Sequence, residues 1–187
     1  GSRQYKKSTF LLDSIDHIIL PKNISLLERP FVKKTLGAKA FDTDGVLKRE
    51  QYFIHDGRVK SYVMGQYSAN QLGLKTTANA GGVNNVMVDA NFEGGLDEMI
   101  QDMGKGLVVT ELMGQGINGT TGDYSRGALG FWVENGKIQY PVSGLTIAGN
   151  LKDMLLGIVH VGTDVDQRSN LKVGSVLINQ MTIAGEG

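Results

Sequence analysis

The sequence predicts an α+β fold, mainly antiparallel β-sheet arranged as a barrel or a sandwich, with two short amphipathic helices. Its 26 glycines stand mostly at isolated positions, which is typical of many turns between short strands. Apolar runs flank one Asp-Gly pair and one Asn-Gly pair, the strongest short signals for β-hairpins. Only two longer segments carry a helical apolar period, and no alternation of strand and helix patterns indicates a parallel sheet.

Short apolar runs and turns follow one another through the first half of the chain. We interpret His17–Leu20 and Ile24–Leu27 as strands, each ended by a nearby proline. Residues 42–45 (Asp-Thr-Asp-Gly) predict a turn, because the glycine comes too early for a calcium loop. A hairpin is expected around Asp56-Gly57, and a polar loop over residues 76–85.

Two segments have the spacing of amphipathic helices. In residues 96–103 the apolar side chains recur at i, i+3, i+4 and i+7, and Gly104 follows as a stop signal. Asn150 is a suitable N-cap for a second helix, whose apolar stripe runs from Leu151 to Ile158. Shorter apolar runs predict a single helical turn and further strands: residues 68–72, 86–88, 159–161 and two strands between 171 and 183.

The stretch from Gly106 to Asn150 organises the sequence. We expect an apolar strand over residues 107–113, then a loop with glycines from Gly114 to Gly130, then a hairpin. The Asn135-Gly136 pair favours a type I′ turn, in which both residues have positive φ. In the expected register Glu134 faces Lys137, Val133 faces Ile138 and Phe131 faces Tyr140.

The glycine loop also fits a nucleotide-binding pattern. Residues 114–119 (Gly-Gln-Gly-Ile-Asn-Gly) match G-x-G-x-x-G after a plausible strand. A dinucleotide site needs a helix to begin at this point, because the helix N-terminus holds the pyrophosphate. No helical apolar period follows, so we reject this interpretation.

Composition limits the classes of function. Nineteen basic and nineteen acidic residues cancel, which gives no reason to expect direct contact with nucleic acid or an anionic membrane. The absence of cysteine excludes disulfides and thiolate metal ligands. No apolar run is long enough to span a membrane. Residues 1–2 (Gly-Ser) resemble an expression scar, and residues 3–187 are expected to be a fragment of a longer protein.

The residues give little sign of a catalytic centre in this chain. The histidines His17, His55 and His160 are far apart in sequence, so no local zinc pair exists and we expect no metal site. Ser125 has no histidine near it in sequence, which argues against a Ser-His-Asp triad. We therefore assign no catalytic residue.

The candidate binding site is the polar cluster in the glycine loop and the strand before it. One interpretation is structural, with Asp123 and Arg126 forming an ion pair that orders the loop and Tyr124 covering the core. In the other, the cluster contacts a peptide or a partner subunit, because glycines permit close backbone approach and arginine can bind a carboxylate bidentately. The candidate residues are Glu111, Gln115, Gly122, Asp123, Tyr124, Ser125 and Arg126.

Several blocks of this sequence resemble the C-terminal part of the TldD/PmbA family, and most closely its PmbA (TldE) branch. The blocks occur in the family's order: residues 109–116, 121–128, 130–136, 140–142 and 146–152. The resemblance implies a C-terminal domain of a longer PmbA-like subunit. Its family is described as modulators of DNA gyrase, as microcin-maturation factors and as a cytoplasmic metalloprotease of two related subunits.

The same resemblance implies where the metal lies. In the TldD-like subunit a helix with H-E-x-x-x-H and a late cysteine bind zinc. This chain has neither element, and its loop 164–170 offers no cysteine. The expected role is thus a non-catalytic subunit that forms a heterodimer with a zinc-bearing TldD-like partner and admits unfolded peptides. The alternative is a non-enzymatic peptide- or protein-binding module acting on gyrase or toxin–antitoxin proteins.

Overall fold

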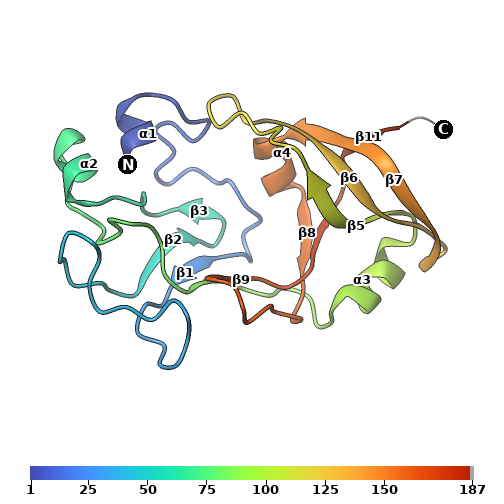
Figure 1. Cartoon of the computed structure of the whole chain (residues 1–187), viewed down its shortest axis with the longest axis horizontal. Coiled ribbons are helices and arrows are strands. Elements are labelled where there is room, and N and C mark those ends of the chain that lie inside the picture. The colour runs from blue at the N-terminus through green and yellow to red at the C-terminus, as the bar shows by residue number, and fades with distance from the viewer. Residues whose placement is uncertain (186–187) are drawn as a thin grey trace.

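The structure is a computed structural model and describes residues 1–185. Its described residues form four helices and eleven strands in three sheets (Figure 1). The strand pairs in the described part are antiparallel, except that β4 pairs with β9 in parallel. This confirms the α+β prediction, although no sheet in the described part closes into a barrel.

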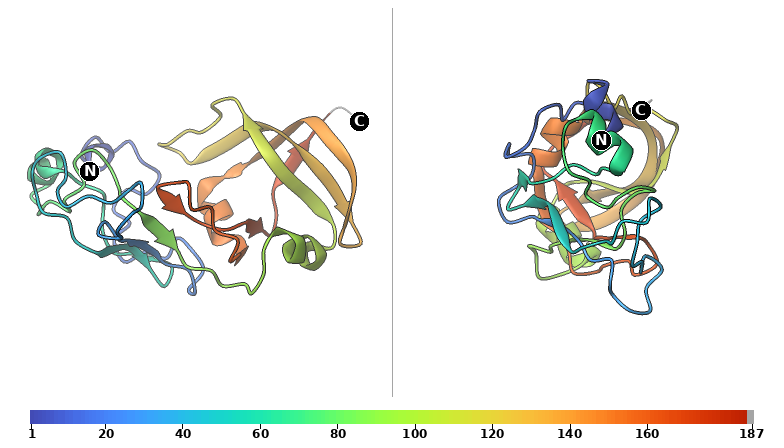
Figure 2. Two further views of the ribbon diagram at one scale, coloured as in Figure 1. Left: turned by 60° about the horizontal axis from the view of Figure 1, so that its bottom comes forward. Right: turned by 90° about the vertical axis from the view of Figure 1, so that its left-hand side faces the viewer.

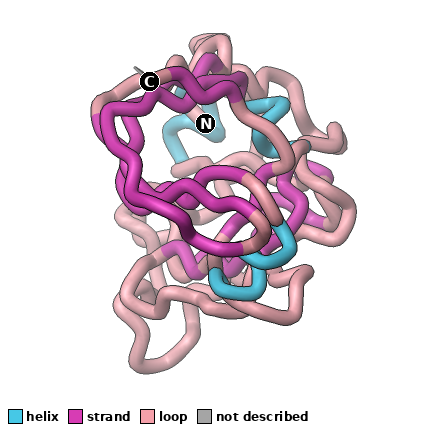
Figure 3. The backbone as a smooth tube through the Cα atoms, turned by 90° about the vertical axis from the view of Figure 1, so that its right-hand side faces the viewer, coloured by secondary structure: helices cyan, strands magenta, loops and turns pink. Residues whose placement is uncertain are grey.

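A four-stranded antiparallel sheet forms one end of the molecule. Its strand order is β11-β7-β6-β5, and the long hairpin of β6 and β7 is its centre (Figure 1). The strands curve rather than lie flat (Figure 3). Their bounds are β5 Gly106–Met113, β6 Asp123–Glu134, β7 Lys137–Asn150 and β11 Thr182–Ala184.

The turn between β6 and β7 confirms the prediction for the Asn135-Gly136 pair. Asn135 has φ 53° and Gly136 has φ 68°, as a type I′ turn requires. The pairs nearest the turn, Val133 with Ile138 and Glu134 with Lys137, are as predicted. The expected pairing of Phe131 with Tyr140 is wrong. A bulge beyond Val133 shifts the register, so that Phe131 lies opposite Pro141.

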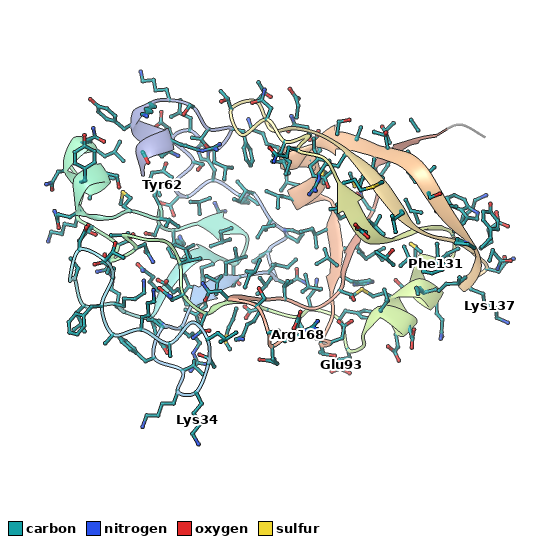
Figure 4. All side chains as sticks on the ribbon, viewed as in Figure 1. Lys34, Tyr62, Glu93, Phe131, Lys137 and Arg168 are labelled. Carbon is teal, nitrogen blue, oxygen red and sulfur yellow. The ribbon has the colours of Figure 1, made fainter. Side chains whose placement is uncertain are left out.

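Helix α3 (Leu96–Met103) packs on this sheet as its apolar period predicted. Ile100, Val108 and Val133 form a buried cluster, and Phe131 packs against it. In Figure 4 Phe131 lies near α3, whereas Lys137 points outward at the hairpin tip. The helix ends at Gly104, whose φ of 67° suits glycine.

The other end of the molecule contains short strands joined by long loops (Figure 2). Its five-stranded sheet has the order β3-β2-β1-β4-β9. The bounds are β1 Leu26–Glu28, β2 Gln51–His55, β3 Arg58–Val59, β4 Val86–Val88 and β9 Leu171–Lys172. The hairpin at Asp56-Gly57 is confirmed, with φ 47° and 75° at the two turn residues.

The strand expected at His17–Leu20 does not form. Only an isolated bridge joins Ile18 to Arg58. The amides of Ile19 and Leu20 both donate to the carbonyl of Gly57, so this segment wraps over the hairpin turn instead of extending a ladder.

The loop of residues 76–85 is confirmed as a loop, but several of its polar side chains are buried. Glu28 and Lys48 are almost fully buried and form an ion pair, with 3.2 Å between Oε1 and Nζ. Asn79 and Gln51 donate side-chain amide hydrogens to the same carboxylate, each at 2.9 Å. This network holds the loop against β1.

Helix α4 (Leu151–Leu156) and strand β8 (Ile158–Val161) lie between the two ends (Figure 1). Asn150 accepts a hydrogen bond from the Lys152 amide at 3.0 Å, which confirms it as the cap of α4. The segment from residue 171 to 183 contributes three strands instead of the two expected. None of the described helices has the length and apolar character of a membrane span. The remaining bounds are α1 Ser2–Tyr5, α2 Gln66–Gln71 and β10 Val176–Ile178.

Candidate functional site

The glycine loop is shorter than the sequence suggested. Strand β6 begins at Asp123, so residues 123–130 lie in the sheet and the loop comprises residues 114–122. A Cβ atom at Gly130 would collide with the carbonyl of Val108 on the neighbouring strand. Gly130 therefore allows two strands to pack closely. A glycine in the sequence can mark either such a close approach or a loop, and the number of glycines does not tell the two apart.

Hydrogen bonds to β6 hold the loop in place. The Ser125 amide donates to the Gly116 carbonyl at 2.7 Å, and the Asn118 amide donates to the Asp123 carbonyl at 2.8 Å. A Cβ at Gly116 would clash with the Ser125 carbonyl, so glycine is required there. The element that follows the loop is β6 and not a helix, which agrees with rejecting a dinucleotide site.

A pocket of about 840 Å³ lies between this loop and the N-terminal segment. In Figure 1 the loop between β5 and β6 approaches α1, and the Phe10 amide donates to the Gly119 carbonyl at 3.0 Å. The pocket therefore joins segments more than a hundred residues apart. Its walls are residues 115–120 and 123–125 on one side and Ser2, Arg3, Lys6 and Ser8 on the other.

The structure brings four of the seven predicted site residues together. Gln115, Asp123, Tyr124 and Ser125 line the pocket. Tyr124 is also only 8% exposed, because its ring packs in the core with Ala128 and Ile147. The other three, Glu111, Gly122 and Arg126, do not line it.

Asp123 and Arg126 do not form the ion pair of the structural interpretation. They are three residues apart on a strand, where side chains alternate between the two faces, so they point to opposite sides. Asp123 accepts a hydrogen bond from the Thr121 hydroxyl at 2.6 Å and one from Asn150 Nδ2 at 3.3 Å. Arg126 instead donates from Nη2 to the Leu112 carbonyl at 3.2 Å, and its buried Nε has no partner among the described residues.

Two cationic residues of the pocket, Arg3 and Lys6, are not among the site residues that the sequence predicted. Arg3 packs against the Cα of Gly119, at a point where a Cβ would meet its guanidinium. Arg3 and Lys6 make no ion pair with any described residue. The basic run from Arg3 to Lys7 is visible in the sequence, but its proximity to residue 119 is not.

Next to the loop, β5 is the edge strand of its sheet. Most of its second half is exposed, including the apolar side chains of Val109, Leu112 and Met113 at 39%, 37% and 43%. An edge strand presents unpaired backbone groups that can pair with another extended chain. Glu111 lies in the middle of this exposed edge.

The described residues of this chain are not arranged to hold a zinc ion. His160 Nε2 is engaged by Asp102 Oδ2 at 2.9 Å, and His55 Nδ1 lies 3.7 Å from Asp56 Oδ2. No group of three histidine, aspartate or glutamate side chains among residues 1–185 is placed to hold a metal ion. The sequence has no cysteine to complete a site. The His160 ring nitrogen that has a hydrogen-bond partner among the described residues contacts Asp102 and not Ser125.

Comparisons with known proteins agree on one family. The family model described as the PmbA/TldA metallopeptidase C-terminal domain matches residues 1–185. The chain is similar to metalloprotease PmbA of Escherichia coli O157:H7, with 52% identity over all of this chain and 41% of the relative. A PmbA homolog of Haemophilus influenzae is 46% identical over 99% of this chain and 41% of its own length.

Solved structures give the same result. A protein of Bacteroides thetaiotaomicron described as a modulator of DNA gyrase has a TM-score of 0.93 and 29% identity, covering 99% of this chain and 42% of that chain. TldE of Thermococcus kodakarensis has a TM-score of 0.83 and 25% identity, covering 98% and 45%. The chain spans about two fifths of the length of these curated relatives. It belongs to the PmbA/TldD metallopeptidase family, whose C-terminal domain it matches.

Proposed function

We propose that this chain belongs to a non-catalytic, PmbA-like subunit of a two-subunit metallopeptidase that acts on unfolded peptides in the cytoplasm. Zinc is then held by the TldD-like partner, and this domain contributes a peptide-binding surface. The relatives are named as metalloproteases, which supports a role for this chain in a metallopeptidase. Among residues 1–185 no three side chains are placed as metal ligands, and two of the three histidines face aspartates, which supports this division of roles.

The exposed edge of β5 is the single observation that best supports peptide binding. An extended peptide can add to such an edge through main-chain hydrogen bonds, which give affinity with little dependence on sequence. The apolar side chains of Val109 and Leu112 offer contacts to alternate residues of the peptide. The lining of the glycine-loop pocket begins at Gln115, shortly after β5 ends at Met113.

Reconstitution with a TldD-like partner tests the proposal. We expect no peptide cleavage by this protein alone, with or without added zinc, and cleavage once the partner is present. A partner variant without its zinc ligands is the control and should abolish cleavage. Cleavage by this chain alone, lost after chelation of zinc, would contradict the assignment of roles.

A second candidate is a binding module that acts on gyrase or toxin–antitoxin proteins without proteolysis. It is supported by the description of two structural relatives as modulators of DNA gyrase. The same assay separates the two candidates. A partner complex that binds these proteins but leaves unfolded peptides intact favours the second.

A further inference from the structure

The pocket between the glycine loop and the N-terminal segment has two cations on one side that form no ion pair within the described residues. Arg3 and Lys6 line it, and neither forms an ion pair with a described residue. The acidic residue of the lining is Asp123, whose carboxylate already accepts hydrogen bonds from Thr121 and Asn150. An anionic group of a ligand would therefore find two unpaired cations.

The segment that carries these cations is fixed in place. The Ser8 amide donates to the Arg3 carbonyl at 2.9 Å, and Gln4 Nε2 donates to the Leu11 carbonyl at 2.6 Å. The Phe10 amide ties the segment to the glycine loop through Gly119. The backbone of Arg3 and Lys6 is thus held beside the loop before any ligand arrives, which reduces the entropy lost on binding.

The opposite wall of the pocket suits the last residues of a peptide. Ile117 is 50% exposed and offers an apolar surface to a side chain. Gln115, Asn118 and Ser125 supply polar side chains that can bond a peptide backbone. An apolar contact next to a cationic one matches a chain end, where a side chain and a carboxylate leave the same Cα atom.

We propose that this pocket binds the C-terminal α-carboxylate of an extended peptide through Arg3 and Lys6, with the last side chain on Ile117. This inference rests on the proposed peptide-binding function and names the part of the peptide recognised. Arginine binds carboxylates by paired hydrogen bonds, and lysine adds a point charge.

Fluorescence anisotropy with the 187-residue chain tests the inference. The probe is the pentapeptide Gly-Ala-Val-Ala-Leu, labelled at its N-terminus with a neutral fluorophore, as the free acid and as the C-terminal amide. We expect the free acid to bind at least about tenfold more tightly than the amide, because only the acid carries the α-carboxylate. The difference should shrink as salt is added.

Variants assign the effect to the pocket. The double variant Arg3→Gln and Lys6→Gln should bind acid and amide equally. Lys7→Gln removes a neighbouring exposed charge that does not line the pocket, and it should keep the full difference. Melting temperatures of all variants should match the parent, because none of these side chains makes a hydrogen bond or ion pair in the described structure.

The outcomes separate this inference from the proposed function. Equal binding of acid and amide overturns carboxylate recognition but leaves peptide binding intact. Binding of neither peptide overturns both. An amide in which the last residue is replaced by aspartate distinguishes the source of the carboxylate. If that peptide binds as tightly as the free acid, the pocket recognises any carboxylate and the C-terminal assignment is wrong.

Discussion

Both ends of the molecule bury apolar clusters, but among the described residues a fully buried ion pair lies at one end alone. At the end that contains β1 to β4, the fully buried side chains include Glu28, Lys48 and Asn85, and hydrogen bonds join the loops. At the other end, β5, β6 and β7 pack apolar clusters around Val133 and Ile147. A buried charged pair depends on its geometry, because each ion must be compensated once it has lost its water. We therefore expect the first end to tolerate fewer substitutions than the second.

The largest effect is expected at the buried ion pair. Lys48→Met removes the countercharge and leaves the Glu28 carboxylate buried, which should lower the free energy of unfolding by about 3–5 kcal/mol. Urea denaturation measures this change. The matched control is Lys105→Met, since Lys105 pairs with Glu134 at 3.4 Å on the exposed surface. The control should unfold like the parent. Equal changes in the two variants would refute the contrast between buried and exposed pairs.

A smaller effect is expected at the turn of the long hairpin. Gly136→Val places a β-branched residue at φ 68°, and its Cβ would lie 3.0 Å from the Cα of Gln101 in α3. The backbone strain should cost about 1–2 kcal/mol, seen as a lower melting temperature. Asn135→Gly is the control, because glycine adopts positive φ without strain. An unchanged melting temperature for Gly136→Val would mean that the turn rearranges freely.

The smallest effect concerns Asp164, which links the loop before β9 to the start of α3. Burial opposes ionisation, but the hydroxyl and amide of Ser175 and the amide of Leu96 donate to the carboxylate, and together they lower the pKa of Asp164 below 3.8. The pKa of Asp164 is lower in the folded chain than in the unfolded chain. The stabilisation that the ionised carboxylate gives to the fold is therefore fully present above the unfolded pKa. It is lost as the pH falls through the folded pKa.

Asp164→Ala tests this linkage. We expect the variant to be less stable than the parent at pH 6 and equally stable once the pH is below the folded pKa of Asp164. Thermal unfolding from pH 6 downward measures the difference. Asp97→Ala, at an exposed position in the first turn of α3, is the control. A constant gap between Asp164→Ala and the parent at every pH would show that the side chain matters only through packing.

The elements that the sequence predicted are those whose signals are local in the chain. Periodicity and turn pairs located α3, α4 and the hairpins at Gly57 and Gly136, because these signals are local. The buried network was not predicted, since Glu28, Lys48 and Asn79 are far apart in sequence and each looks like a surface residue. The failed strand at His17–Leu20 has the same cause, because its partner is the carbonyl of Gly57.

Part of the candidate site could not be predicted from local signals in the sequence either. Asp123, Tyr124 and Ser125 could be selected because unusual chemistry stands between glycines. Strand alternation separates Asp123 and Ser125, but not Tyr124, from Arg126, and it was missed when this part of β6 was interpreted as loop. Arg3 and Lys6 could not be placed, because a contact between residues 10 and 119 leaves no local trace in the sequence.

The central claim is that the pocket between the two ends serves peptide binding and not the stability of the fold. The most direct test is the double variant Gln115→Ala and Ser125→Ala, because both side chains line the pocket and the hydrogen bond at position 125 uses the main chain. The measurement is peptide cleavage per folded protein in the complex with a zinc-bearing partner. We predict that kcat/KM falls at least about tenfold, while the melting temperature stays within about 2 °C of the parent. A melting temperature that falls with cleavage in proportion to folded protein, or unchanged cleavage, would contradict the account.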